Sequence, residues 1–267
     1  MKVRPPIRRI LIILACAMML GLAARAIPAF ASDATTQPAD DSKSAQISQW
    51  INQLADDDPD LRRAAAQSLM GLSADDLPTL RECALKQSPL LPGQISALRE
   101  IVTQVYLSGD NEPVTPAVGF LGLHWPPPNP QGMMQIGVIQ PDDLNTDGLP
   151  VVERIPGFPA YRLLQPGDLI TAVLNEPDID VHDRSQFIQS VSQMKAGDEL
   201  DLQIKRGGQN IEIPLKLAPR PLSLLGEPAN YDAWLDERLT DARDFWNKSF
   251  SDLEPQSPQT SADTTQP

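Results

Sequence analysis

The chain has 267 residues, with 35 Asp and Glu against 22 Lys and Arg, which gives a formal net charge of −13. Its length allows two modest domains. A chain this acidic repels phosphate backbones and anionic lipid, so the composition predicts no nucleic-acid partner.

The first 31 residues have the form of a secretory signal peptide. Basic residues open the chain, residues 10–24 are almost wholly apolar, and Ala29-Phe30-Ala31 offers a small-x-small cleavage site. The apolar run is short for a membrane span, and it continues past Cys16, which argues against a lipoprotein. We expect an exported, periplasmic or secreted protein without stable membrane insertion after cleavage. Retention of the segment as an anchor is the alternative.

Residues 32–44 are rich in Asp, Thr, Gln, Pro and Ala without periodicity, which predicts a disordered linker. Residues 45–109 then carry apolar residues at helical spacing and predict a small helical domain. Ser73, with Asp76 three residues later, is a candidate helix cap. The predicted apolar stripes, helix by helix, are Ile47, Trp50, Ile51 and Leu54, then Leu61, Ala64, Ala65, Ser68 and Leu69, then Leu77, Leu80 and Ala84, and finally Ile95, Leu98, Ile101, Val102 and Val105.

Within this helical region, residues 56–65 (DDDPDLRRAA) resemble the start of a HEAT-repeat helix. A solenoid needs about three or more stacked repeats, and the region holds one or two. We therefore predict a compact helical bundle whose role is packing or protein contact.

Residues 116–222 predict a small sheet domain. Residues 199–205 and 211–217 both alternate apolar and polar side chains, which is the period of a half-buried strand. The glycine-containing cluster between them, residues 206–210, suits a tight hairpin. Residues 168–174 are nearly all apolar, as in a strand that is covered on both faces.

A helix is predicted at residues 184–195, and Gly197 can end it. Its apolar residues recur at helical spacing: Phe187, Ile188, Val191 and Met194. A small sheet capped by such a helix makes an α+β domain, built as a β-sandwich or a partly open barrel. With the helical domain before it and an amphipathic helix after it, the chain is predicted to be α+β as a whole.

Three further elements give residues 148–217 a family resemblance. A strand ends in Ile155-Pro156-Gly157, a Pro-Ala pair follows at Pro159-Ala160, and the sequence Leu-Gln-Pro-Gly-Asp-Leu-Ile occupies residues 164–170. In this order and spacing, the segment resembles a PDZ module of the bacterial type, which follows the protease domain in periplasmic high-temperature-requirement proteases.

The resemblance implies a peptide-binding groove. In such a module an exposed strand edge pairs with an extended peptide, the nearby helix forms the other wall, and loop N–H groups capture the terminal carboxylate. The family's loop is a short element of glycine between apolar residues, for which residues 119–123 fit best and residues 135–138 compete. The implied peptide-binding residues are Gly119, Phe120, Leu121, Gly122, Leu123, Phe187, Ser190 and Val191. The apolar helix residues among them can equally belong to the core.

The C-terminal part predicts an amphipathic helix at residues 228–252 and a disordered tail at residues 253–267. The apolar residues on one side of that helix are Trp234, Leu235, Leu239, Ala242, Phe245, Trp246 and Phe250. Such a stripe most often packs on the protein's own core. A second subunit, or a groove on another protein, is the alternative.

The sequence nominates no catalytic residue, no metal site and no cofactor. His124 and His182 have no neighbouring Cys or His at metal-ligand spacing. The sequence contains neither Gly-x-Ser-x-Gly nor Gly-Asp-Ser-Gly, the serine-hydrolase elements. Residues 143–148 match the first half of a calcium loop, but Arg154 stands at the twelfth position, where a glutamate is required. A turn explains these residues equally well.

The function favoured by the sequence is a non-enzymatic extracytoplasmic module that binds a protein or peptide ligand by its carboxyl terminus or an extended segment. One alternative is an accessory or substrate-sensing subunit of a separate envelope protease. Another is a structural protein whose groove is blocked by the Pro-rich segment after Trp125 or by the C-terminal helix.

Overall fold

A computed structural model of the protein describes residues 39–109, 113–125, 148–225 and 231–254. The predicted signal peptide, the competing glycine element at residues 135–138 and the tail after residue 254 lie outside these ranges. So do residues 143–147 of the half calcium loop. None of the helices in the described part of the chain combines the length and apolar character needed to span a bilayer.

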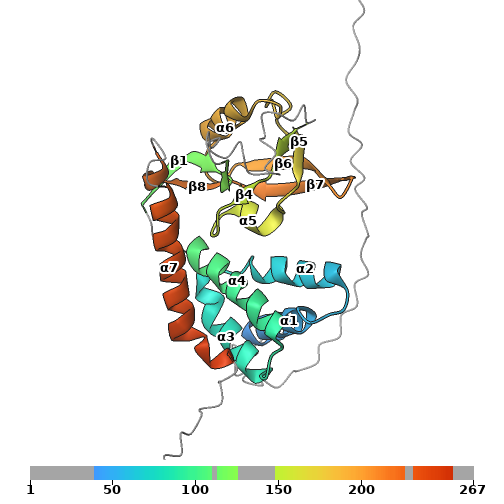
Figure 1. Ribbon diagram of the computed structural model, residues 1–267, viewed down its shortest axis with the longest axis vertical. Helices are drawn as coiled ribbons and strands as arrows, with labels where there is room; N and C mark the ends of the chain where they lie inside the picture. Colours follow the sequence, from blue (N-terminus) through green and yellow to red (C-terminus); the bar gives the residue numbers. More distant parts are fainter. Residues whose placement is uncertain (1–38, 110–112, 126–147, 226–230, 255–267) are drawn as a thin grey trace, which may run out of the picture. The chain divides into compact units, whose positions relative to one another are not determined.

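The helical region consists of five elements (Figure 1): α1 (Ala39–Gln53), α2 (Pro59–Leu69), the 3₁₀ turn η1 (Ala74–Asp76), α3 (Leu77–Lys86) and α4 (Pro92–Ser108). Residues 39–44 are helical, whereas the sequence assigned them to the linker. Lys43 explains part of this difference, because its Nζ lies 2.5 Å from the Asp76 carboxylate and ties the first turns of α1 to η1. Local composition could not reveal that partner.

A single apolar core holds the helical region together, and most of the predicted stripes point into it. Ile47, Leu80 and Leu98 are fully buried, whereas Leu61 is 44% exposed and was wrongly assigned to the core face. The predicted cap at Ser73 is confirmed as a capping box, with the Ser73 N–H donating to Asp76 Oδ2 at 3.0 Å. These helices form a compact bundle, as predicted.

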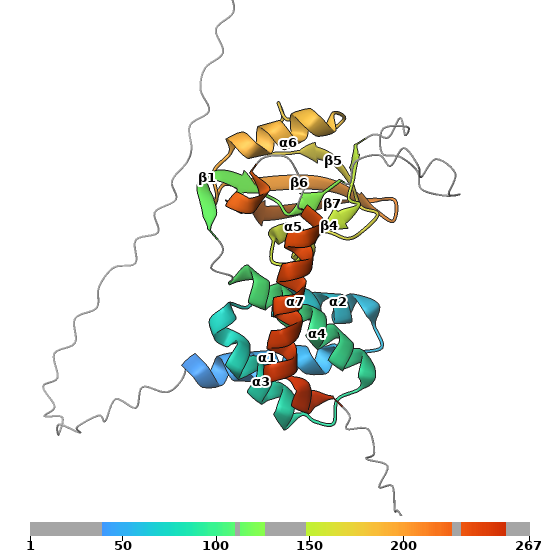
Figure 2. The same ribbon diagram turned by 60° about the vertical axis from the view of Figure 1, so that its left-hand side comes forward.

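The sheet region contains three antiparallel sheets, and the described strands do not close into a barrel. One sheet has four strands in the order β3-β5-β6-β7, and two pairs, β1 with β8 and β2 with β4, complete the region. In both views α6 lies on one side of the four-stranded sheet (Figures 1 and 2). The elements are β1 (Val114–Phe120), β2 (Leu123–His124), β3 (Leu149–Pro150), β4 (Glu153–Arg154), α5 (Pro159–Leu163), β5 (Leu169–Val173), α6 (Arg184–Gln193), β6 (Glu199–Arg206), β7 (Gln209–Lys216), β8 (Ala218–Pro221) and the 3₁₀ turn η3 (Leu222–Leu224). The predicted α+β architecture is therefore confirmed.

The hairpin between β6 and β7 follows the sequence prediction closely. Pairing runs without a shift from Glu199 opposite Lys216 to Arg206 opposite Gln209. The turn residues Gly207 and Gly208 have φ of +57° and +85°, the positive values that a two-residue hairpin turn requires. This turn fixes which side chains of both strands face the core.

The end of α6 differs from the prediction. The helix stops at Gln193, and Gly197 lies in the following turn, where its N–H donates to Leu217 O at 2.8 Å. The Asp198 carboxylate accepts from the Lys195 N–H at 2.8 Å in the same turn. Gly197, with a φ of +91°, therefore shapes the entry to β6 and does not cap the helix.

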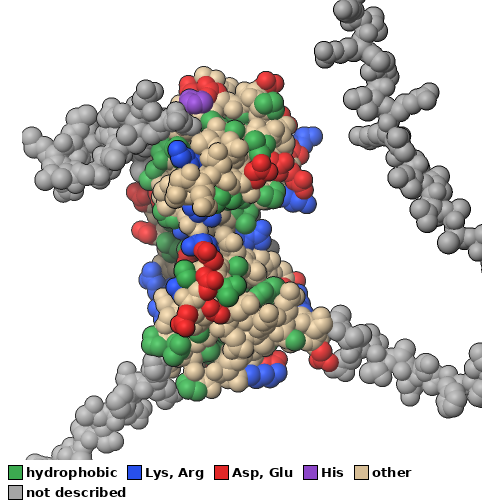
Figure 3. Space-filling view, turned by 90° about the vertical axis from the view of Figure 1, so that its right-hand side faces the viewer, with side chains coloured by type: hydrophobic (Ala, Val, Ile, Leu, Met, Phe, Trp, Pro, Cys, Tyr) green, Lys and Arg blue, Asp and Glu red, His purple; other side chains and the backbone are tan. Residues whose placement is uncertain are grey.

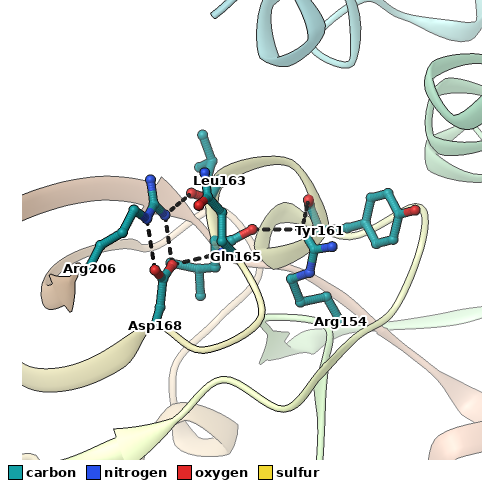
Figure 4. Close-up of polar contacts among 7 residues, drawn as sticks. Arg154, Tyr161, Leu163, Gln165, Asp168 and Arg206 are labelled. Carbon is teal, nitrogen blue, oxygen red and sulfur yellow. Dashed lines mark hydrogen bonds and ion pairs between the residues drawn. The ribbon is translucent and has the colours of Figure 1, made fainter. Parts of the chain in front are cut away.

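Asp168 is the most deeply buried acid of the sheet region, with a side chain only 1% exposed. Its two oxygens accept from Arg206 Nε and Nη2 at 2.7 and 2.6 Å, and one also accepts from the Gln165 N–H at 2.7 Å (Figure 4). Arg206 Nη2 further donates to Leu163 O at 3.2 Å. This forked pair fastens the turn before β5 to the end of β6.

The C-terminal helix α7 (Tyr231–Ser249), which the 3₁₀ turn η4 (Ser251–Leu253) follows, packs along α4. Near its end, Trp246 and Phe250 are 1% exposed and belong to the core of the helical region. At its start, Tyr231 packs with Ile155 and Phe158 of the sheet region. The predicted apolar stripe therefore covers the protein's own core, and it joins two separate clusters.

Between these two ends, the buried Arg238 holds α7 against both regions. Its Nη2 donates to Leu107 O at 3.2 Å, and its guanidinium carbon lies 5.4 Å from the Phe158 ring centre and 5.0 Å from that of Trp234. Gln104 of α4 adds a direct link between the two regions, since its Oε1 accepts from the Gly157 N–H at 2.6 Å.

On the face drawn in Figure 3, hydrophobic side chains are scattered among acidic and basic ones, as is usual for a protein surface.

We predict that Asp168→Ala lowers the free energy of unfolding by about 3 kcal/mol, because it leaves the Arg206 guanidinium and the Gln165 N–H without their acceptor. Urea denaturation followed by circular dichroism measures the change. Glu199→Gln is the matched control, since the Glu199–Lys216 pair is exposed and its atoms lie 3.4 Å apart. Equal stabilities of the two variants would contradict the structural role given to Asp168.

Candidate functional site

The strand β2 has one paired edge and one edge that no described strand covers. Among the described strands it pairs only with β4, with Leu123 opposite Arg154 and His124 opposite Glu153. The Ile155 N–H donates to Gly122 O at 2.8 Å, which places a hydrogen bond between the two segments next to the Leu123–Arg154 pair. Because bonded and non-bonded pairs alternate along antiparallel strands, the N–H and C=O of Leu123 point away from β4. An incoming strand could pair with them.

The segment just before β2 forms a tight loop. The Gly119 N–H donates to Met194 O at 2.6 Å, which ties the loop to the end of α6, and the Leu121 carbonyl accepts from the Ala160 N–H at 3.0 Å. Among the described residues, no acceptor meets the N–H groups of Leu121 and Gly122. The loop therefore presents two backbone donors beside the open strand edge, an arrangement that suits an anion.

Gly122 allows the chain to make this turn. Its φ is +80°, and a Cβ at this position would lie 2.1 Å from the Cβ of Phe158. Both the backbone angle and the close approach of Phe158 require a residue without a side chain. Phe158 packs in turn against Phe120, with ring centres 4.9 Å apart in an edge-to-face arrangement.

A groove of about 450 Å³ runs between this strand segment and α6. Its apolar floor comes from Leu121, Leu123, Phe187 and Val191, all of which are buried. Trp125 stands over the floor, since its ring packs edge-to-face on Phe187 and its Nε1 donates to Pro150 O at 2.8 Å. The complete lining is Gly119, Phe120, Leu121, Leu123, His124, Trp125, Ile155, Arg184, Ser185, Phe187, Ile188, Val191, Ser192, Arg220, Leu224 and Tyr231.

The charged side chains that line the groove are all basic, although the chain as a whole is acidic. Arg184 is the first residue of α6, and Arg220 reaches the groove from β8. Arg220 Nη2 donates to Leu224 O at 2.7 Å, while its buried Nε has no partner among the described residues. Burial lowers the pKa of Arg220, because a charged guanidinium is less stable away from water.

The far wall of the groove joins β2 to α7. The His124 and Tyr231 rings stack with centres 3.8 Å apart, and the Tyr231 hydroxyl donates to Glu153 Oε1 at 3.3 Å. Burial lowers the pKa of His124, and Arg184 lowers it further, while Glu153 and Asp232 act in the opposite direction. The imidazole is therefore neutral near pH 7, which suits a ring stacked on an aromatic face.

The structure brings most of the residues proposed from the sequence to one place. Gly119, Phe120, Leu121, Leu123, Phe187 and Val191 line the groove. Gly122 shapes the loop without lining the groove, and Ser190 faces elsewhere, so that Ser185 and Ser192 stand in its place.

Sequence reasoning missed two groups of lining residues. On α6, Arg184, Ile188 and Ser192 follow each other at intervals of four, and this spacing is visible in the sequence. The structure adds that Ile188 is 42% exposed. The others, Arg220, Leu224 and Tyr231, come from segments after the last strand of the hairpin. No local pattern in the sequence links them to the groove.

Another cleft, of about 540 Å³, lies where α4 and the residues around α5 meet, and its lining includes Gln104, Gly157 and Arg162. Pro214, Leu215 and Lys216 of the edge strand β7 also line it, and Gln104 already satisfies the Gly157 N–H there. The described residues contain no group of three or more His, Cys, Asp or Glu side chains placed to hold a metal ion. The groove beside β2 is therefore the candidate functional site.

Comparison with known proteins identifies part of the sheet region. Residues 134–217 match the family described as PDZ domain, so this part of the chain is a PDZ domain. The match spans less than half of the chain, and it leaves out β2, the loop before β2, β8 and α7, all of which contribute residues to the groove. No curated protein matches the sequence.

A solved structure of an HtrA-type protease with a decapeptide is similar to part of the chain. The sequences are 19% identical, the TM-score is 0.31, and the similarity covers 50% of this chain and 36% of that one. The chain thus corresponds to about a third of that protein's length, and a likeness this weak assigns no residue.

We predict that Gly122→Ala destabilises the fold more than Gly167→Ala. Both glycines have positive φ, a conformation that costs an alanine about 1 kcal/mol. At Gly167 nothing lies within 4 Å of the added Cβ, whereas at Gly122 Phe158 must also move. Urea denaturation of the two variants gives the difference, and equal losses would show that the contact with Phe158 is not restrictive.

We also predict that the stability of the protein falls on acidification partly through His124. Its pKa is lowered in the folded state, so between the ordinary value of about 6.5 and the lower folded value the unfolded chain binds a proton first. The contribution of the neutral His124 to the free energy of unfolding is present above pH 6.5 and is lost as the pH falls toward the lower folded-state pKa. His124→Phe keeps an aromatic ring against Tyr231 without the titration. Between pH 7.5 and pH 5.5, the melting temperature should therefore fall less for this variant than for the wild-type protein. An equal fall in the two proteins would rule out the contribution of His124.

Proposed function

We propose that the protein is a non-catalytic, exported binding protein that takes up the carboxyl terminus, or an extended segment, of another polypeptide in the groove beside β2. One observation carries the proposal. The edge of β2 that no described strand covers ends at the N–H groups of Leu121 and Gly122, which have no acceptor among the described residues, and it lies along an apolar floor. Strand, anion donors and apolar cavity are the three features that recognition of a peptide tail needs.

A bound tail would add a strand to β2. Its backbone would pair with the N–H and C=O of Leu123, and its terminal carboxylate would reach the donors of Leu121 and Gly122. Since the loop is tied to the end of α6 through Gly119, the terminus would lie at that end of the helix. The rest of the peptide would run toward Arg184.

The last side chain of the ligand would enter the floor between Leu121 and Val191. Complete burial of a Leu or Phe side chain contributes about 1.5–3 kcal/mol, so an apolar last residue is expected. Ile188 of α6, 42% exposed at the groove, offers further apolar surface to the preceding residues. Micromolar affinity would need only a few such contacts beside the backbone pairing.

Three features outside the groove support the wider proposal. The signal-like residues 1–31 favour export. The residue pattern nominates no nucleophile or base, which favours binding without catalysis. The helical region before the sheet region would offer a second contact surface, which also suits an accessory subunit that presents ligands to a separate enzyme.

A fluorescence-anisotropy screen tests the proposal with the chain from residue 32 onward and a library of labelled peptides in free-acid and amidated forms. We predict that free-acid peptides with an apolar last residue bind, and that amidation weakens them at least tenfold. Ile188→Asp should reduce binding to a similar degree, because it places a charge at the apolar groove. Gln189→Asp is the matched control, since Gln189 is exposed on the same helix and does not line the groove.

Equal binding of free-acid and amidated peptides would argue for internal extended segments as ligands. Binding that is unchanged in Ile188→Asp would place the peptide outside this groove. Loss of binding in the Gln189→Asp control would mean that a new negative charge on α6 weakens peptide binding without contacting the peptide.

A further inference from the structure

If a ligand strand pairs with β2, the groove provides a wall on each of the two faces of that strand. On one side, Leu121 and Leu123 belong to the cluster that α6 covers. On the other side, Phe120 packs in the cluster of Phe158 and Tyr231, and His124 stacks on Tyr231. Because side chains of a strand alternate between its two faces, successive ligand residues would meet the α6 wall and the α7 wall in turn.

One basic side chain stands on each wall. Arg220 belongs to the α7 wall, since its guanidinium carbon lies 5.8 Å from the Phe120 ring centre and its Nη2 donates to Leu224 O. Its buried Nε still lacks an acceptor among the described residues. Arg184 belongs to the α6 wall, and within the described residues it makes no ion pair.

The two arginines stand at different distances from the carboxylate end. Arg220 lies by Phe120, next to the donor loop, and so close to the penultimate ligand residue. Arg184 and Gln193 are the two ends of α6, which at 1.5 Å per residue are about 13 Å apart. An extended peptide rises about 3.3 Å per residue, so it reaches Arg184 about four residues before its end. That position faces the same wall as the last residue, as Arg184 requires.

We propose that the groove selects acidic peptide tails, in which an apolar last residue follows an acidic penultimate residue bound by Arg220, with a second acidic residue about four positions upstream bound by Arg184. The proposal rests on the peptide-binding function above and specifies its ligand. The carboxylates of such a tail would supply the ionic partners that Arg184 and Arg220 lack among the described residues.

The acidic side chains of the chain near these arginines, Asp183, Glu153 and Asp232, do not pair with them. Asp183 caps α6, where it accepts from the Ser185 and Gln186 N–H groups at 2.8 and 3.0 Å. Glu153 is engaged by the Tyr231 hydroxyl, and Asp232 does not line the groove. The negative charge of the whole chain repels an acidic ligand only weakly, because salt screens charges beyond about 8 Å at physiological ionic strength.

The test uses the chain from residue 32 onward and labelled six-residue peptides that end in a free leucine. Four peptides carry Glu or Gln at the penultimate position and at the fourth position before the last. We expect each Glu to raise affinity about three- to fivefold over Gln, as partly exposed ion pairs do. Arg220→Gln should remove the preference at the penultimate position alone, and Arg184→Gln the preference at the upstream position alone. Lys205→Gln, which makes the same charge change at an exposed site on β6, should alter neither.

The outcomes separate this inference from the function on which it rests. Equal affinity of the wild-type protein for all four peptides, with amidation still weakening binding, would overturn the acidic preference and leave the groove intact. Failure of every free-acid peptide to bind would overturn the peptide-binding function itself. A preference for Glu that persists in both arginine variants would show that other residues read the charge.

Discussion

The apolar stripe of α7 is the constraint on which the rest of the structure depends. A helix of this length is stable mainly through the face it buries. Trp246 and Phe250 complete the core of the helical region, and Tyr231, at the other end, completes a small cluster in the sheet region. Arg238 lies between them and holds Leu107 O and two aromatic rings. The helical region and the sheet region are thereby packed together. In agreement with this, residues 38–267 form one compact unit.

This packing brings to the groove parts of the chain that lie outside the matched PDZ segment. The matched residues supply α6 and the main sheet, but the donor loop comes before them and Arg220 and Tyr231 come after them. The groove consequently has a second wall, which a strand and a single helix could not provide. Because Tyr231 stacks on His124 of the groove strand, the position of α7 and the shape of the groove depend on each other.

Charge is distributed in opposite ways over the chain and the groove. The chain has a large excess of acidic residues, which keeps proteins soluble and disfavours anionic polymers as partners. The charged residues of the groove are two arginines. Short-range contacts decide recognition because long-range repulsion is screened, so an acidic protein can still hold a carboxylate at a local basic site.

The sequence by itself determined the elements that depend on near neighbours along the chain. The alternation in β6 and β7, the two glycines of their turn, the helical stripes and the capping box at Ser73 are all local patterns, and each was readable. The loop at Gly119–Leu123 was proposed from its resemblance to a family element, and the competing element at residues 135–138 lies outside the described residues. Only the tertiary structure decided that α1 begins at Ala39, that Ile188 and Ser192 of α6 line the groove where Ser190 had been chosen, and that Arg220, Leu224 and Tyr231 complete it. These outcomes depend on burial and ion pairing between residues far apart in the chain, and no local period encodes which distant surface a side chain will meet.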